Sequence, residues 1–223
     1  LATSYGKRIC ESLIKDLTYL DVQIISGLAY GIDAHAHRQS LHNNIETIAV
    51  LGHGLDRIYP SAHRELASKI LTHGGLLTEF ASGTNPDRQN FPMRNRIIAG
   101  LADVTIVVEA AIKGGALITA EIANSYNRDV CAFPGGIDQD LSAGCNYLIK
   151  TNRAHLIRNA HDLCHLMNWE VDKKEVSNQL KLIPDKLNKD ELRIYQFIQE
   201  KQQVSIDDIS LYCNWPQSKL AII

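Results

Sequence analysis

Continuously apolar runs alternate with segments of helical periodicity along most of the chain. The strand-like runs are VQII (22–25), TIAVL (47–51), GLLTEF (75–80), VTIVV (104–108) and VCAF (130–133), with a weaker one at AHLI (154–157). Helical patterns occupy about 33–43, 61–73, 95–102, 115–127 and 143–151. Apolar strands that alternate with helices indicate a mostly parallel sheet with helices on both faces. The pattern therefore predicts an α/β fold.

The pattern changes after Trp169, which predicts two domains joined by a linker. We expect a first domain over 1–169, a polar linker of mixed charge over 170–189, and a partial winged-helix-like module over 190–223. In the module, two short amphipathic segments precede a third that starts near Pro216, and Ser205 can cap the second. A generic helical hairpin used for protein contact fits these segments equally well. Because the chain starts at Leu1, inside an amphipathic pattern, and ends within another, we expect it to be a fragment.

Composition limits the kinds of partner. The chain has 223 residues, 45% of them hydrophobic and 22% charged, and a formal net charge of −2. It is therefore globular, and any anion site must be local because no basic field surrounds the molecule. The cysteine number is odd and no C-x-x-C spacing occurs: Cys10, Cys131, Cys145, Cys164 and Cys213. We expect a reduced, cytoplasmic protein with no signal peptide and no membrane span.

The turns that follow the strands are rich in glycine. They read SGLAYGID, GHGLDRIYP, EFASGTNP, EAAIKGGA and FPGGID, and four of the five hold two glycines. Small residues let a ligand approach the backbone, and the helices that follow point free N–H groups at it. Any single turn could be an ordinary strand-to-helix connection. As a set, the turns predict an anion-binding surface at the carboxyl ends of the strands, which we call the carboxyl edge.

Motifs for catalysis are weak. The chain has no complete G-x-G-x-x-G, no P-loop and no G-x-S-x-G. His161, Cys164 and His165 share a helix face but lack an evident fourth ligand, so a zinc site is disfavoured. Glu79 and Glu109 end strands, where an acid or base would stand. We expect them to accept hydrogen bonds from loop N–H groups rather than to catalyse a reaction.

Basic and aromatic residues gather in one segment. Arg88, Phe91, Arg94 and Arg96 lie within nine residues, and Lys113 follows the next strand. Arginine forks bind phosphates, and a phenylalanine outside the core offers a stacking face. On this chemistry alone, three interpretations stay open: a single-stranded nucleic acid, a nucleotide or other small phosphorylated ligand, and structural ion pairs. We expect NFPMRNR (90–96) to be a loop anchored to the core by IIAGL (97–101).

Six blocks in a fixed order carry a family resemblance. They are SGLAYGIDAHAHR, IAVLGHGLDRIYPSAHREL, LLTEF, NFPMRNRIIAGLADVTIVVEA, GALITAEIA and FPGGIDQDLSAGCNYLIK. Over about Tyr5 to Leu166 the chain closely resembles the DprA/Smf family of DNA-processing proteins. The resemblance implies an extended Rossmann-like domain that binds single-stranded DNA, protects incoming DNA and forms a homodimer. It also implies help in loading the RecA recombinase during natural transformation, with no established catalysis and no cofactor.

The resemblance also implies site residues. The expected DNA-binding positions are Ser26, Gly27, Tyr30, Gly52, His53, Arg88, Phe91, Arg94, Arg96, Lys113 and Gly115. Of the arginines, Arg96 is the one we expect to brace the segment. Tyr30 and Gly115 depart from the family, which commonly has arginine and serine there. The family's leading helical domain, its first strand and the phosphate-binding loop after that strand have no counterpart in this sequence.

One rival is a nucleotide-binding enzyme related to the nucleoside phosphoribohydrolases. Those enzymes have a similar sheet and a P-G-G-x-G-T-x-x-E motif. This chain has Pro134, Gly135 and Gly136 but continues as IDQDLSAG. The missing Gly-Thr pair and glutamate disfavour this alternative.

Overall fold

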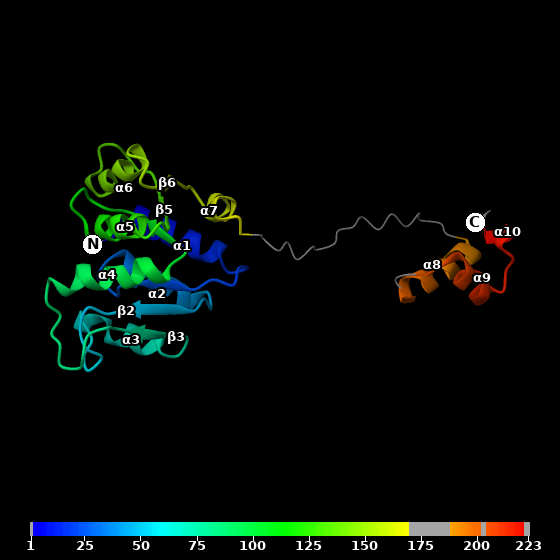
Figure 1. Ribbon diagram of the computed structural model, residues 1–223, viewed down its shortest axis with the longest axis horizontal. Coiled ribbons are helices and arrows are strands. Elements are labelled where there is room, and N and C mark those ends of the chain that lie inside the picture. Colours follow the sequence, from blue (N-terminus) through cyan, green and yellow to red (C-terminus); the bar gives the residue numbers. More distant parts are fainter. Residues whose placement is uncertain (1, 170–187, 202–203, 221–223) are drawn as a thin grey trace. The chain divides into compact units, whose positions relative to one another are not determined.

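The computed structural model describes residues 2–169, 188–201 and 204–220. The chain divides into two compact units, Leu1–Val171 and Asp172–Ile223, which are described separately (Figure 1). The predicted linker, 170–189, lies outside the described residues except for its last two positions. Within the ranges given above, no helix is both long and apolar enough to cross a membrane. All five cysteines are buried and free.

Strands and helices alternate through the first unit, as predicted. The elements are α1 (Ser4–Asp16), β1 (Ile24–Ser26), α2 (Ile32–His42), β2 (Thr47–Val50), a 3-10 turn (Ser61–His63), α3 (Arg64–Ile70), β3 (Gly74–Leu77), α4 (Asn90–Leu101), β4 (Val104–Val107), α5 (Gly115–Ser125), β5 (Asp129–Ala132), α6 (Asp140–Lys150), β6 (His155–Leu156) and α7 (Ala160–Met167). Every strand pairing is parallel. The predicted α/β class is confirmed.

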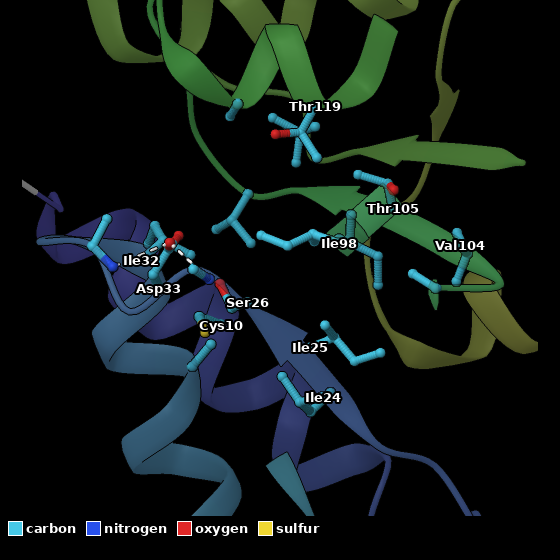
Figure 2. A pocket seen from close by; sticks show the side chains of 18 of the residues that line it. Cys10, Ile24, Ile25, Ser26, Ile32, Asp33, Ile98, Val104, Thr105 and Thr119 are labelled. Atoms are coloured by element: carbon cyan, nitrogen blue, oxygen red, sulfur yellow. Dashed lines mark hydrogen bonds between the residues drawn. The ribbon is translucent and has the colours of Figure 1, made fainter. Parts of the chain in front are cut away.

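The strands form two sheets where the sequence suggested one. The orders are β1-β2-β3 and β4-β5-β6. The unpaired edges of β1 and β4 both line a cavity of about 1260 Å³. Figure 2 shows Ile25 of β1 and Thr105 of β4 on opposite sides of this cavity. The expectation that the family's first strand has no counterpart in this sequence stays a prediction.

Helices cover both faces of the second sheet. Cys131 of β5 packs in an apolar cluster with residues of α1 and α7, whereas its neighbours Val130 and Ala132 pack with residues of α5 and α6. Successive strand residues point to opposite faces, so a strand buried on both sides must be apolar at every position. The continuous apolar run at 130–133 was a correct sign of this arrangement. Helix α1 also lies beside α2, and α4 beside α5 (Figure 1).

Helix α4 corrects one expectation. NFPMRNR is not a loop, because the helix already begins at Asn90. Pro92 lies in its first turn, where a missing N–H removes no helical hydrogen bond. The Asn90 side chain donates to the Asn85 carbonyl oxygen, 3.1 Å away, and ties the helix to the preceding loop. The predicted start near 95 was late because this first turn is polar.

The described residues of the second unit form three short helices, α8 (Lys189–Lys201), α9 (Ile206–Cys213) and α10 (Gln217–Leu220). Ser205 caps α9 as predicted, and Asp208 completes a capping box by accepting from the Ser205 amide. The Phe197 and Tyr212 rings stack with centroids 4.0 Å apart and join α8 to α9. The assignment as a partial winged-helix-like module stays a prediction.

His37 of α2 is a buried polar group in the first unit. Its Nδ1 lies 2.7 Å from the Thr47 hydroxyl oxygen, and that hydroxyl donates to the Ile24 carbonyl oxygen. Nδ1 must therefore carry the ring proton, while Nε2 has no hydrogen-bond partner. Burial lowers the pKa of His37 to about 4, and the nearby charge of Asp33 opposes this shift.

This histidine predicts an acid-sensitive fold. An unfolded histidine titrates near 6.5, so between pH 6.5 and about 4 only the unfolded chain takes up the proton. The free energy of unfolding should fall as pH drops through this window, by up to about 1.4 kcal/mol per pH unit. Above pH 6.5 His37 should contribute no dependence on pH. Urea unfolding across pH 4.5–7.5 measures this slope.

The substitution H37Q should flatten the slope. The matched control is H42Q, which removes an exposed histidine of the same helix and should leave the slope unchanged. An unaltered slope in H37Q would contradict the assignment.

Candidate functional site

The expected site residues fall into two groups at the carboxyl edge. Six of them line the cavity described above: Ser26, Gly27, Tyr30, Phe91, Arg94 and Gly115. The other five do not line it: Gly52, His53, Arg88, Arg96 and Lys113. The contacts of each side chain show which of these residues hold the fold and which face outward.

Arg94 is buried, with 5% of its surface exposed. Its guanidinium donates to the Gly27 carbonyl oxygen at 2.7 Å and to the Val50 carbonyl oxygen, so it joins the ends of β1 and β2. Burial lowers the pKa of Arg94, and the charge of Asp33 opposes this effect. Arginine stays charged in proteins.

The expected division between the two arginines is therefore reversed. Arg94 is the residue that braces the structure, because its Nη1 donates to two buried backbone oxygens. Arg96 is exposed and forms an ion pair with Glu79 instead. A sequence cannot show this difference, since the two side chains stand on different faces of a helix that was taken for a loop.

Asp33 fixes the turn after β1. One carboxylate oxygen accepts from the Gly27 amide at 3.1 Å and from the Ala29 amide at 3.3 Å. Between them, Leu28 has a φ of +58°, and its carbonyl oxygen lies 2.8 Å from Nδ1 of buried His63. The Gly27 amide thus already has an anionic partner. This differs from the expected phosphate contact at Gly27.

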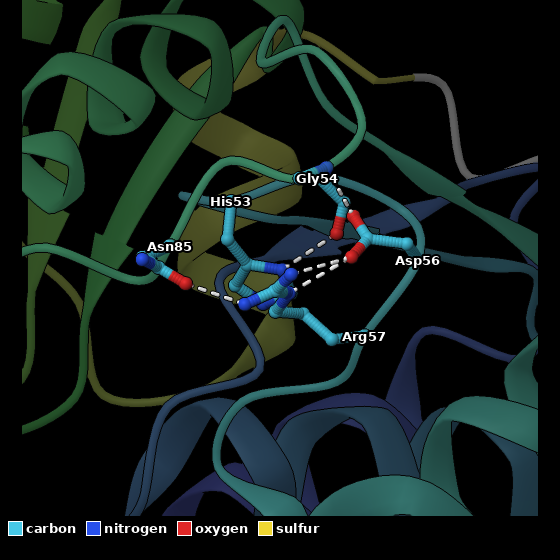
Figure 3. A network of polar contacts seen from close by, with 6 residues as sticks. His53, Gly54, Asp56, Arg57 and Asn85 are labelled. Atoms are coloured by element: carbon cyan, nitrogen blue, oxygen red, sulfur yellow. Dashed lines mark hydrogen bonds and ion pairs between the residues drawn. The ribbon is translucent and has the colours of Figure 1, made fainter.

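His53 is also structural. It is buried, its Nδ1 lies 2.9 Å from the Gly54 carbonyl oxygen, and its Nε2 accepts from the Tyr59 amide at 3.3 Å. Both ring nitrogens therefore have partners within the protein, and the DNA contact expected at His53 stays a prediction. Figure 3 shows the surrounding network, in which Arg57 bridges the Asp56 carboxylate and the Asn85 side chain. The turn after β2 is thereby tied to the loop after β3.

The two glutamates at strand ends have partners inside the protein. Glu109 accepts from the Thr3 amide at 2.9 Å and from the Thr3 hydroxyl at 2.6 Å, next to the start of α1. The expected hydrogen-bonding role is confirmed for Glu109, whereas Glu79 pairs with Arg96. Across the described parts of the chain, no group of three or more histidine, cysteine, aspartate or glutamate residues could hold a metal ion.

Three aromatic rings lie at the carboxyl edge. Phe91 is half-buried and packs over Gly52, where a Cβ would approach the Phe91 ring to 3.0 Å. The Tyr59 ring lies 5.9 Å from the Phe91 ring, centroid to centroid. Tyr30 is 59% exposed and meets the His63 ring edge-on at 4.9 Å. Sequence reasoning missed Tyr59, although it stands in GHGLDRIYP, a turn that was noted for its glycines.

Two cations at this edge are exposed. Arg88 and Lys113 form no ion pair with any residue that the structure describes. Lys113 precedes α5, whose first residue, Gly115, is exposed and has space for a side chain. Helix N-termini and lysines both attract anions. The arrangement can therefore hold a phosphate near the start of α5.

Two glycines of the site should respond oppositely to substitution. In G27A the new Cβ would lie 2.6 Å from the Arg94 guanidinium, so the Arg94 contacts must shift and stability should fall by about 1–3 kcal/mol. In G115A the Cβ meets nothing within 4 Å, and the unfolded chain loses freedom. G115A should therefore be neutral or stabilising by up to about 1 kcal/mol. Urea unfolding compares them, and equal effects would contradict the assigned packing.

The two arginines provide a second matched pair. Arg94 Nη1 donates to both carbonyl oxygens, and the shorter, more strongly hydrated lysine of R94K should lose at least one of these buried charged hydrogen bonds, at a cost of about 1.5–3 kcal/mol. R96K keeps an exposed charge near Glu79 and should cost less than about 1 kcal/mol. Thermal and urea unfolding measure both. A larger loss in R96K than in R94K would show that the bracing role is wrongly assigned.

Comparisons with known proteins agree on one family. The family model for DNA recombination-mediator protein A matches residues 1–168. Protein Smf of Synechocystis sp. is 47% identical over 161 residues, which make up 72% of this chain and 40% of that protein. The X-ray structure of DNA processing protein A from Streptococcus pneumoniae is similar with a TM-score of 0.68 and 41% identity, over 74% of this chain and 57% of that one.

A third similar protein is DNA processing protein A from Helicobacter pylori, whose structure is described as showing a unique single-stranded DNA binding mode. Its TM-score is 0.68 with 27% identity, over 75% of this chain and 76% of that one. The fold is thus Rossmann-like, as the resemblance implied. Since the described edge, the family model and these relatives agree, the chain belongs to the DprA/Smf family of DNA recombination-mediator proteins.

Proposed function

We propose that this chain binds single-stranded DNA along the carboxyl edge. The observation that carries the proposal is the exposed chemistry of that edge, where Lys113 and Arg88 form no ion pair with a described residue and Tyr30 is 59% exposed. The nearby carboxylates of Asp33 and Glu109 accept hydrogen bonds from backbone amides of the protein itself. The relative from Helicobacter pylori binds single-stranded DNA, which supports the same ligand here.

The proposed contacts with DNA are of two kinds, ionic contacts with phosphates and stacking on bases. Exposed cations would neutralise backbone phosphates, and aromatic faces would stack on bases without selecting their identity. Because Arg94, Asp33 and His53 hold the turns in place, little ordering is needed when DNA arrives. Binding should therefore favour unpaired bases over duplex and depend strongly on salt.

The wider role is proposed from the family. The DNA-bound chain would protect incoming strands and help load the RecA recombinase during natural transformation, acting as a homodimer and not as an enzyme. Two linked sites would hold one strand more tightly through effective concentration. This chain spans 40% of the length of the Synechocystis relative, so these activities belong to a proposal about the whole protein.

Equilibrium binding to a labelled poly-dT oligonucleotide and to a duplex of equal length, across a salt series, tests the binding proposal. We expect tighter binding of the single strand at every salt concentration. Equal affinity for both, or binding without salt dependence, would refute it. Release of a base from AMP would favour the phosphoribohydrolase alternative.

Lys113 should contribute one phosphate contact. K113Q should reduce the slope of log K against log salt by about 0.7, the single-strand value for one phosphate, without changing thermal stability. The control is K150Q, which removes an exposed lysine in the last turn of α6, at the opposite edge of the sheet. Equal slopes for K113Q and K150Q would exclude Lys113 from the site.

A further inference from the structure

We propose that Tyr59 provides the accessible stacking surface for a DNA base, and that Phe91 serves as its support. This inference rests on the proposed function and names a residue outside the set expected from the family. Tyr59 ends the turn after β2 and has 48% of its surface exposed. It lines the same cavity as Tyr30 and Phe91.

Phe91 is half-buried and has three close neighbours. Gly52 lies directly against the ring, since a Cβ there would come to 3.0 Å from Phe91 Cδ1. The Arg94 guanidinium carbon lies 5.9 Å from the Phe91 centroid. Tyr59 approaches from another side at 5.9 Å, with the two rings inclined by 31°. Phe91 is thus half-buried among three neighbours, and Tyr59 is the more exposed ring of the pair.

Tyr59 is held in place before any ligand arrives. Its amide donates to Nε2 of His53, 3.3 Å away, and the His53 ring is fixed in turn by the Gly54 carbonyl oxygen. Arg57, two residues earlier, bridges Asp56 and Asn85 (Figure 3). The next residue, Pro60, is buried. An exposed ring on so restrained a backbone loses little freedom when a flat ligand covers it.

The chemistry of this position fits a base better than a phosphate. Tyr59 carries no charge, and its nearest described ring neighbour, Phe91, is apolar. A ring face accepts any base, which agrees with binding that does not depend on sequence. The cations Arg88 and Lys113 supply the phosphate contacts elsewhere on the same edge.

A fluorescent substitution tests stacking directly. Y59W keeps an aromatic face, and its indole emission should be quenched when poly-dT binds with affinity near that of the wild type. The matched control is Y126W, which replaces a tyrosine of 47% exposure at the carboxyl end of α5. Y126W should bind equally well without added quenching. Equal quenching of both variants would overturn the inference.

An affinity series provides the second measurement. Y59A should weaken binding of poly-dT by about 5- to 150-fold with an unchanged salt slope and melting temperature, as expected for one base–aromatic stack. Y59F should bind like the wild type, and Y126A should have no effect. In F91A the melting temperature should fall as well, because Phe91 itself packs against Gly52 and near the Arg94 guanidinium.

The outcomes separate this inference from the proposed function. If the wild type binds single-stranded DNA and Y59A binds as tightly, the role of Tyr59 is refuted while the function stands. If the wild type itself does not bind poly-dT, the proposed function fails, and the inference fails with it.

Discussion

A single buried guanidinium holds the carboxyl edge together. Arg94 reaches from α4 to the carbonyl oxygens that end β1 and β2, and no other described side chain donates to both. A buried charge is costly unless it is paired and hydrogen-bonded, so the surrounding backbone must keep its oxygens directed at this group. Gly27 has no side chain because a Cβ would occupy the space of the guanidinium.

The outward-facing residues depend on this brace. Phe91 stands one helical turn before Arg94, and its ring packs between the guanidinium and Gly52. Tyr59 in turn packs on Phe91. On the other side, Asp33 fixes the turn whose next residues carry Tyr30 into solvent. The charged groups of Arg94 and Asp33 thus hold in place the backbone segments that carry the neutral aromatic rings.

Hydrophobic periodicity in the sequence predicted the strands and helices. It could not predict which residues far apart in the chain contact one another. Continuous apolar runs located the strands of the first unit, most clearly β2 and β5, which are the most buried. The start of α4 was missed, since its first turn is polar and contains Pro92. The roles of Arg94 and Arg96 were exchanged because spacing alone does not say which side chain faces the core. Tyr59 was overlooked because its partner, Phe91, is far away in the chain.

The residues that hold the fold and the residues that form the exposed surface of the carboxyl edge occupy different positions in the chain. Tyr30 and Gly115 are both exposed. A change at either position alters the surface offered to a ligand without disturbing the contacts of Arg94. The surface of this edge and the stability of the fold can therefore change in evolution through substitutions at separate positions.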